Sequence, residues 1–270
     1  MATRPLLRRL NRLWRWFGTV FSFAVFGLGS LLMGLFIAPV YWLLFRKRSD
    51  YRRRVRRLVA GALRFFIRLM RFFGVLHYRI EGLRSEEGRP ALILANHPSL
   101  IDVVFLLALF PEAQCVVKRA LWLNPVTRLI VSACDYIPND DPELFLNASV
   151  ASLQEGQSLI LFPEGTRTGV DGMFSFKPGA AAIAMRSGAH IQPVLLSVTP
   201  PTLSKADLWY SVPADKVHMD ICILPVWKPS VQREEAGGHP GRRHDARRLN
   251  SDMESWFRNR VAAWKPHSTA

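Results

Sequence analysis

The clearest signal for the fold is residues 91–102, which read ALILANHPSLID. The first five, residues 91–95, are small or aliphatic and uncharged, which is typical of a strand buried on both faces of a sheet. Asn96-His97-Pro98 then ends the apolar run. Loops at the ends of buried strands carry functional groups in α/β proteins, so we expect a functional loop directly after this strand.

Short apolar runs and helical patterns alternate on both sides of this strand. The expected strands are residues 77–81, 115–117, 158–162, 192–198 and 219–224, and the expected helices are residues 100–110, 120–133, 142–155 and 178–187. Strands that alternate with helices predict an α/β fold in which a mixed sheet is flanked by helices. The sequence has no internal repeat and no glycine-rich loop of the nucleotide-binding kind.

A long apolar segment precedes this pattern. Residues 17–45 are 29 consecutive residues without a charge, whereas a bilayer core about 30 Å thick needs roughly 20 helical residues. We expect either one tilted membrane helix or a re-entrant helical hairpin that turns at Gly27, Gly29, Gly34 or Pro39. A cleaved signal peptide does not fit, because its apolar region is about 7–15 residues long and a small-residue cleavage site follows it.

The positive charge of the chain belongs to its N-terminal part. The formal net charge is +15, and residues 1–80 hold 17 of the 36 lysines and arginines with a single acid, Asp50. The remaining residues are nearly neutral, which argues against binding of nucleic acid by the body of the protein. Arginines beside a long apolar run favour an anionic membrane surface. Positive-inside bias then places the α/β body on the cytoplasmic face of the inner membrane.

Residues 51–73 predict an amphipathic helix. One side of it carries a stripe of arginines, and apolar residues cover most of the remainder; the stripe consists of Arg53, Arg57, Arg64, Arg68 and Arg71. Such a helix can lie in the membrane interface, with the arginines reaching toward lipid headgroups. The alternative is an ordinary helix that packs its apolar face on the protein core and leaves the basic stripe in water.

These patterns divide the chain into three parts. Residues 1–74 are expected to form a basic membrane-anchoring segment, and residues 75–231 the α/β domain. Residues 232–270 are expected to form a polar linker at 232–244 and a C-terminal amphipathic helix. Three widely spaced cysteines, Cys115, Cys134 and Cys222, predict neither a metal site nor a disulfide framework. Cys115 and Cys222 lie in apolar runs and are interpreted as buried thiols.

The first candidate catalytic group is the histidine after the 91–95 strand. Asp102 follows His97 by five residues, so it falls in the first turn of the next expected helix, within reach of one imidazole nitrogen. A carboxylate on that nitrogen fixes the tautomer and leaves the other nitrogen to accept a proton from an attacking hydroxyl. The alternative is structural, because Pro98 and Ser99-x-x-Asp102 also resemble the start of a capped helix.

A second polar loop follows another expected strand and reads Phe162-Pro163-Glu164-Gly165-Thr166-Arg167. Gly165 permits a positive φ or a close backbone approach. Arg167 offers a planar fork that suits a phosphate group. Alone, this motif would be a surface turn with a solvated arginine. Together with the His-Asp pair, it predicts a site for an acceptor that bears both a hydroxyl and a phosphate.

In these motifs the chain resembles the lysophosphatidate (1-acyl-glycerol-3-phosphate) acyltransferases and the wider glycerolipid acyltransferase superfamily. The resemblance covers roughly residues 75–230 and follows four blocks in order: Asn96 to Asp102, Lys118-Arg119 with Leu121 to Pro125, Phe162 to Arg167, and the apolar stretch around Pro193. The first and third blocks together are specific, and a membrane helix before the first block is usual in the family. Asp102, where the lipid A acyltransferases have a glutamate, points away from that branch.

The resemblance implies transfer of an acyl group from acyl-CoA or acyl-carrier protein to the hydroxyl of a lysophospholipid, first of all 1-acyl-glycerol-3-phosphate, giving phosphatidate. His97 would be the general base and Asp102 would orient it. The implied acceptor site consists of Lys118, Arg119, Glu164, Gly165, Thr166 and Arg167. Neither an acyl-enzyme nor a metal or other cofactor is implied. The expected partners are the thioester co-substrate, the lysophospholipid and anionic membrane lipids.

The second block departs from the family pattern. It ends Tyr136-Ile137-Pro138-Asn139-Asp140, and no arginine follows its acids, whereas many family members carry an Asp-Arg pair there. A phosphate ligand is then missing, so a lyso-ornithine lipid, another lysolipid or a pigment-type acceptor stays open as an alternative. An inactive membrane-binding scaffold is the remaining alternative, but it would have no need of the complete set His97, Asp102 and Arg167.

Overall fold

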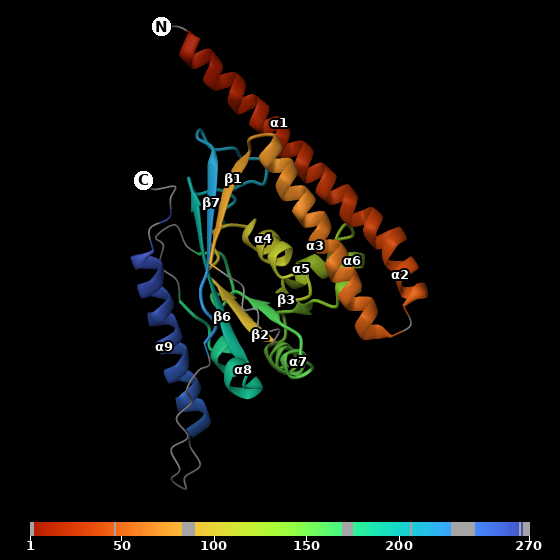
Figure 1. Ribbon diagram of the computed structural model, residues 1–270, viewed down its shortest axis with the longest axis vertical. Coiled ribbons are helices and arrows are strands. Elements are labelled where there is room, and N and C mark those ends of the chain that lie inside the picture. Colours follow the sequence, from red (N-terminus) through yellow and green to blue (C-terminus); the bar gives the residue numbers. More distant parts are fainter. Residues whose placement is uncertain are drawn as a thin grey trace.

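The computed structural model describes residues 3–45, 47–82, 90–168, 175–205, 207–227, 241–264 and 266. The helices are α1 (Thr3–Leu32), the π-helix η1 (Met33–Ile37), α2 (Ala38–Leu44), α3 (Arg48–Phe72), α4 (Asp102–Leu109), α5 (Arg119–Leu123), α6 (Arg128–Cys134), α7 (Pro142–Gln154), α8 (Gly179–Ser187) and α9 (Gly241–Ala263). The strands are β1 (Leu76–Glu81), β2 (Ala91–Ala95), β3 (Gln114–Val117), β4 (Ile137–Pro138), β5 (Leu159–Leu161), β6 (His190–Thr199) and β7 (Val217–Ile223). Figure 1 shows their arrangement.

The strands form one mixed sheet in the order β1-β7-β6-β2-β5-β3-β4. The pairs β6–β2, β2–β5, β5–β3 and β3–β4 are parallel, and β7 runs antiparallel to β6. The predicted α/β fold with a mixed sheet flanked by helices is confirmed. Because five neighbouring strands are parallel, their carboxyl ends meet at one edge of the sheet, and the loops that follow them lie side by side.

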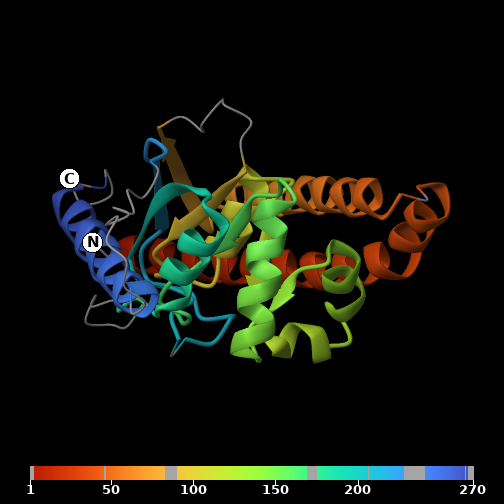
Figure 2. The same ribbon diagram turned by 90° about the horizontal axis from the view of Figure 1, so that it is seen from below.

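Helices cover both faces of the sheet, as Figure 1 and Figure 2 show. The residues of β2 alternate between the two faces. Ile93 and Ala95 join one core, with α3, α4 and α6, while Leu92 and Leu94 join the other, with α7, α8 and α9. All five residues of β2 are buried, which agrees with the uninterrupted apolar run in the sequence.

Two details of the fold differ from the sequence prediction. The single helix expected at residues 120–133 is wrong: α5 and α6 are separate, because Asn124-Pro125 interrupts the pattern and a proline cannot continue a helix from its preceding turn. The strand β4 was not predicted, since it is two residues long and contains a proline. Most of the linker expected at residues 232–244 lies outside the described residues, and the last four belong to α9.

The apolar N-terminal segment is one long helix. The chain is helical from Thr3 to Leu44, with the π-helix η1 directly before Pro39, where the missing N–H and the ring disturb α-helical hydrogen bonding. Residues Leu7–Leu44 are long and apolar enough to cross a bilayer, with a mean hydropathy of 2.2 in their most apolar part. The expected turn at Gly27, Gly29, Gly34 or Pro39 is therefore wrong, since the chain turns back only after α2.

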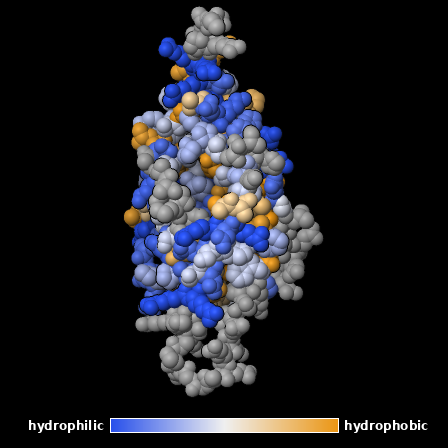
Figure 3. Space-filling model, turned by 90° about the vertical axis from the view of Figure 1, so that its left-hand side faces the viewer, coloured by the Kyte–Doolittle hydropathy of each residue, from blue (hydrophilic) through white to orange (hydrophobic). Residues whose placement is uncertain are grey.

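After this turn α3 returns along α1, and the two helices lie side by side (Figure 1). Among the residues that the structure describes, most of the exposed large apolar side chains lie on α1, η1 and α2. The face on the α9 side, shown in Figure 3, is mainly hydrophilic, with scattered apolar residues. The helical pair therefore gives one side of the molecule a different surface chemistry from the side that carries α9.

The amphipathic pattern of α3 serves mainly to pack this helix on the body. Val55, Leu63, Phe66 and Met70 are buried against the core that contains α4 and α6, as the core-packing alternative expected. The stripe Arg53, Arg57, Arg64, Arg68 and Arg71 is exposed. Two apolar residues nevertheless face outward, because Phe65 is 57% and Phe72 is 79% exposed.

A glycine at the end of β1 provides a test of the sheet. Gly82 has a φ of +83°, and a Cβ there would overlap the carbonyl oxygen of Ile223 in β7. We expect Gly82→Ala to lower the free energy of unfolding by about 1–3 kcal/mol, measured as a lower midpoint of thermal or urea unfolding. Gly61→Ala is the matched control, because that position is exposed on α3 with open space around it. Equal destabilisation by both changes would contradict the prediction.

Candidate active site

The loop after β2 brings His97 and Asp102 into contact. The Nδ1 atom of His97 lies 2.9 Å from Oδ2 of Asp102, and the same oxygen accepts a 2.7 Å hydrogen bond from the N–H of Ser99. Asp102 is completely buried, while the side chain of His97 is 16% exposed. With Nδ1 bound to a carboxylate, Nε2 is the imidazole nitrogen that can exchange a proton with a substrate.

Burial controls the electrostatics of this pair. The loss of solvent around the carboxyl group raises the pKa of Asp102, and the hydrogen bonds from His97 and from the N–H of Ser99 oppose that rise. A buried carboxylate with two donors stabilises positive charge on the neighbouring imidazole. The arrangement can therefore support an imidazole that takes up a proton during a reaction.

The structural alternative for this segment, a capped helix start, forms in part, because Oδ2 of Asp102 accepts from the N–H of Ser99 as in one half of a capping box. The residue that caps α4 is Ile101, and no side chain caps the helix. The hydroxyl of Ser99 instead donates to the carbonyl oxygen of Thr202, 2.8 Å away, in the segment after β6. Ser99 thus ties the His97 loop to the β6 side of the sheet.

The loop after β5 encloses His97. The ring of Phe162 stacks on the imidazole with centroids 4.0 Å apart. Oε1 of Glu164 accepts hydrogen bonds from the N–H of His97 at 2.9 Å and from the hydroxyl of Thr168 at 3.0 Å, and the N–H of Thr168 donates to the carbonyl oxygen of His97 at 2.7 Å. Burial raises the pKa of Glu164. This carboxyl group holds the backbone of His97, a contact that sequence reasoning did not predict.

The rest of the motif lies further out. Gly165 and Thr166 are exposed, and the φ of +66° at Gly165 explains the glycine there. Arg167 is half-buried, and its Nη1 donates to the carbonyl oxygens of Leu203 at 2.8 Å and Ser204 at 2.6 Å. One of the guanidinium nitrogens predicted to bind phosphate is therefore already bound to backbone oxygens. This contact holds the segment after β6 beside the site.

Two further predicted residues follow β3. Since β3 pairs with β5, and β5 with β2, Lys118 lies at the same sheet edge as the loop of His97, where it is the N-cap residue of α5. Lys118 and Arg119 are exposed, and Nε of Arg119 lies 3.6 Å from Oδ2 of Asp140. The acid at the end of the second block thus faces an arginine from the beginning of the same block.

Asn96 is a positioning residue that the sequence did not reveal. Its side-chain amide donates to the carbonyl oxygen of Leu196 and accepts from the N–H of the same residue, both at 2.8 Å. The side-chain amide therefore makes with β6 the same pair of hydrogen bonds that a backbone peptide group would make, directly after β2 ends. An asparagine after a buried strand is an ordinary turn signal, so only the neighbouring strand gives it this role.

The site contains neither a metal-binding cluster nor a reactive thiol, as far as the described ranges of the chain extend. No group of three or more potential ligands from His, Cys, Asp and Glu comes together in these ranges. Cys115 and Cys134 are buried, and burial raises the pKa of each thiol to about 12. Proton transfer by His97 is the chemistry that this geometry offers.

Comparison with known proteins places the chain in a family. Residues 77–197 match the model of the Acyltransferase family. The 1-acyl-sn-glycerol-3-phosphate acyltransferase of Pseudomonas aeruginosa is 30% identical over 184 residues, which are 66% of this chain and 68% of that protein. This chain belongs to the glycerolipid acyltransferase family. The resemblance drawn from the sequence motifs is confirmed, and so is the prediction of an acyltransferase at the level of the family.

Other relatives show how wide this family is. A lysophospholipid acyltransferase of Arabidopsis thaliana is 30% identical over 176 residues, which are 57% of this chain and 43% of that protein. This chain spans about half the length of further curated relatives. The crystal structure of the 1-acyl-sn-glycerophosphate acyltransferase PlsC of Thermotoga maritima has a TM-score of 0.69 and 19% identity, covering 94% of this chain and 99% of that one. At that identity the likeness concerns the fold.

Proposed function

We propose that this glycerolipid acyltransferase moves a fatty acyl group from a thioester donor, acyl-CoA or acyl-carrier protein, to the hydroxyl of 1-acyl-glycerol-3-phosphate, giving phosphatidate. The observation that carries the proposal is the contact between Nδ1 of His97 and the buried carboxylate of Asp102. Nε2 of His97 accepts the proton of the acceptor hydroxyl as its oxygen attacks the thioester carbonyl carbon. The tetrahedral intermediate then expels the thiolate, which takes up a proton, and the new ester is released.

The proposed identity of the acceptor rests on the charged residues at the sheet edge of His97 and on the names of the relatives. Arg167 follows β5, which neighbours β2, and Lys118 and Arg119 follow β3, the next strand beyond β5. These three side chains offer cations to a phosphomonoester, Arg167 through its guanidinium nitrogens other than Nη1. The name of the P. aeruginosa relative supports 1-acyl-glycerol-3-phosphate. Another lysolipid is the second candidate, supported by the A. thaliana relative and by the lack of an arginine after Asp140.

Donor and acceptor can be identified in one experiment. Membranes that contain the purified enzyme are supplied with labelled acyl-CoA or acyl-carrier protein and with a panel of lysolipids, with and without a phosphomonoester. Labelled phosphatidate as the main product would support the proposal. If the main product came from an uncharged or zwitterionic lysolipid, the proposed acceptor would be wrong and that lysolipid would take its place. If no pair of donor and acceptor gave a product, the proposed activity would be contradicted.

We further propose that α1, η1 and α2 hold the enzyme on the cytoplasmic side of the membrane. This rests on the apolar length of Leu7–Leu44 and on the basic residues at both of its ends. Fractionation after a carbonate wash tests the association. Protease treatment of right-side-out and inverted vesicles tests the face, and cleavage of the α/β body only in right-side-out vesicles would contradict it.

Lys118→Gln probes the acceptor site. If the Lys118 ammonium binds the acceptor phosphate, its loss is expected to lower kcat/KM for 1-acyl-glycerol-3-phosphate by about 10- to 100-fold, mostly through KM. A lysolipid without a phosphomonoester should be affected much less. Arg186→Gln is the matched control. Arg186 is exposed near the C-terminal end of α8, shortly before β6 begins, and the beginning of β6 lies at the sheet edge away from His97. Equal losses for both acceptors would rule out this role of Lys118.

A further inference from the structure

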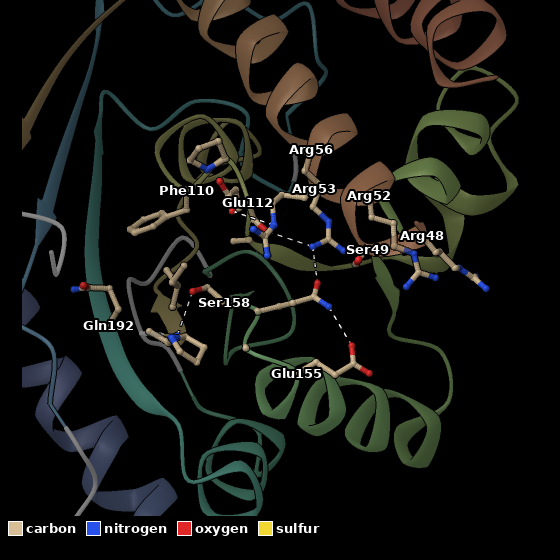
Figure 4. A pocket seen from close by; sticks show the side chains of 17 residues that line it. Arg48, Ser49, Arg52, Arg53, Arg56, Phe110, Glu112, Glu155, Ser158 and Gln192 are labelled. Atoms are coloured by element: carbon tan, nitrogen blue, oxygen red, sulfur yellow. Dashed lines mark hydrogen bonds and ion pairs between the residues drawn. The ribbon is translucent and has the colours of Figure 1, made fainter. Parts of the chain in front are cut away.

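One cavity of the protein lies away from His97. Its volume is about 590 Å³, and its walls come from the beginning of α3, from the segment after α4 and from residues before or at the start of the central strands. Ala91 begins β2 and lines the cavity, whereas His97 follows the end of that strand. At about 3.3 Å per residue, the two lie roughly 20 Å apart, at opposite edges of the sheet. Figure 4 shows the cavity from close by.

The lining of this cavity is rich in arginine. Four arginines of α3 line the cavity, Arg48, Arg52, Arg53 and Arg56, and its acids are Glu112 and Glu155. The lining thus carries an excess of two positive charges. Because arginine guanidinium groups bind phosphate oxygens through pairs of parallel hydrogen bonds, such an excess favours a doubly charged oxyanion.

The acids nearby neutralise only part of this charge. Glu112 is shared, since its carboxylate lies 3.5 Å from Nε of Arg53 and also binds Arg57 from outside the cavity. Arg52 forms a 2.8 Å ion pair with Asp135. Arg48 forms no ion pair with any acid among the residues that the structure describes. The rim of the cavity therefore retains arginine that can bind a further anion.

Arg56 is the deepest cation of the group. It is 3% exposed, and it donates from Nε to the carbonyl oxygen of Cys134 and from Nη1 to the carbonyl oxygen of Glu112 and the side chain of Gln157. Burial lowers its pKa. Within the described part of the chain nothing accepts a hydrogen bond from its Nη2. The oxygens that accept hydrogen bonds from this buried guanidinium are neutral, and the nearby Asp135 is already paired with Arg52. A further anion nearby therefore offsets part of the cost of burying the charge.

The beginning of α3 adds a third feature that favours an anion. Arg48 and Ser49 in its first turn line the cavity, and its N-cap residue, Lys47, makes no side-chain hydrogen bond to the helix. The one acid of this turn, Asp50, is exposed and does not line the cavity. The first N–H groups of a helix lack partners within it, and the helix dipole favours negative charge at this end. Here this end of a 25-residue helix and the buried Arg56 belong to the same cavity.

We propose that this cavity is a second binding site, for a phosphate-type dianion, separate from the acyltransferase site. Arg48 and Arg53 bind the phosphate oxygens together with the start of α3, and the buried charge of Arg56 strengthens the attraction. The volume of the cavity exceeds the size of a phosphate ion, so a phosphomonoester with a polar substituent also fits. Exposed Trp42, Leu43 and Leu44 lie just before Arg48 in the chain, so the phosphate can belong to a lipid headgroup as well as to a soluble anion.

The test uses the full-length protein in neutral detergent and follows thermal unfolding at constant ionic strength. Inorganic phosphate is titrated against chloride, and in a second arm phosphatidate is compared with phosphatidylcholine in mixed micelles. A ligand that binds only the folded state raises the unfolding temperature. A rise with phosphate that the double variant Arg48→Gln with Arg53→Gln loses assigns the anion to this cavity, and a rise with phosphatidate alone that the same variant loses assigns a lipid headgroup to it. A rise that this variant keeps belongs to the acyltransferase site, whose proposed acceptor also carries a phosphate, and would overturn the proposal. No rise in either arm would overturn the proposal.

Variants separate this site from general charge effects. The double change Arg48→Gln with Arg53→Gln is expected to weaken binding at least tenfold. The control is Arg54→Gln with Arg68→Gln, which removes the same charge from exposed positions of α3 outside the cavity. Equal weakening by both pairs would show charge screening and overturn the site. Arg56 is left unchanged because its loss can unfold the protein, and far-UV circular dichroism checks that both double variants are folded.

Discussion

Acyl transfer by the His97→Ala variant is expected to be about 10²- to 10⁴-fold slower than by the wild-type enzyme, which is the usual contribution of a general base. Alanine removes the Nε2 atom that, in the proposed mechanism, accepts the proton of the acceptor hydroxyl, and it leaves the backbone contacts of His97 with Glu164 and Thr168 in place. The loop should therefore keep its shape. Turnover is measured with labelled thioester donor and 1-acyl-glycerol-3-phosphate in purified membranes.

His190→Ala is the control for this change. His190 is half-buried at the beginning of β6, so it lies at the sheet edge opposite to His97. We expect this variant to retain its activity, and both variants to remain in the membrane fraction, because α1 and α2 are unchanged. Wild-type turnover by His97→Ala would refute the proposed mechanism.

The Asp102→Asn variant is expected to separate activity from stability. An asparagine oxygen can still accept a hydrogen bond, but it cannot stabilise positive charge on His97, so kcat should fall by about 10²- to 10⁴-fold with little change in the donor KM. Burial raises the pKa of Asp102, which means that the ionised carboxylate opposes folding. A neutral amide removes that penalty, so the melting temperature should equal or exceed that of the wild type.

The opposite pattern would identify a structural residue. If Asp102→Asn lost stability and activity together, and if the activity per folded molecule were unchanged, Asp102 would serve only to hold the loop. Asp102→Glu is a useful companion, because it keeps the charge but displaces it from Nδ1 of His97. A partial recovery of kcat relative to the asparagine variant would support the charge as the decisive property.

The parts of the fold that depend on local pattern could be predicted from the sequence. The strand β2 follows from an uninterrupted apolar run, and the contact between His97 and Asp102 follows from their separation of five residues across a loop and a first helical turn. Both depend on residues close together in the chain, for which periodicity and spacing are informative.

Contacts between distant segments could not be predicted in the same way. Glu164 was assigned to the acceptor site on the strength of its motif, but its carboxylate binds the backbone of His97 because β5 lies beside β2. Arg56 lies outside the arginine stripe predicted for this helix, and no contact was predicted for it, yet it is buried and hydrogen-bonded to the body. It lies on the inner side of α3, where it reaches the carbonyl oxygens of Glu112 and Cys134. Sequence spacing gives the side of a helix, and only the packed neighbours decide what that side contacts.

The close packing of α1 and η1 against the rest of the protein has a practical consequence for the design of shorter variants. A Cβ at Gly18 would lie 2.5 Å from Cβ of Phe73, and a Cβ at Gly34 would lie 2.6 Å from Cβ of Leu129, so the helix backbone touches the body directly. Arg15 also donates to the carbonyl oxygens of Ala214 and Asp215. A fragment that begins at α3 would lack the apolar surface of α1, η1 and α2, but it would expose the apolar surface of the body that these helices cover. Such a fragment would therefore still require detergent to stay in solution.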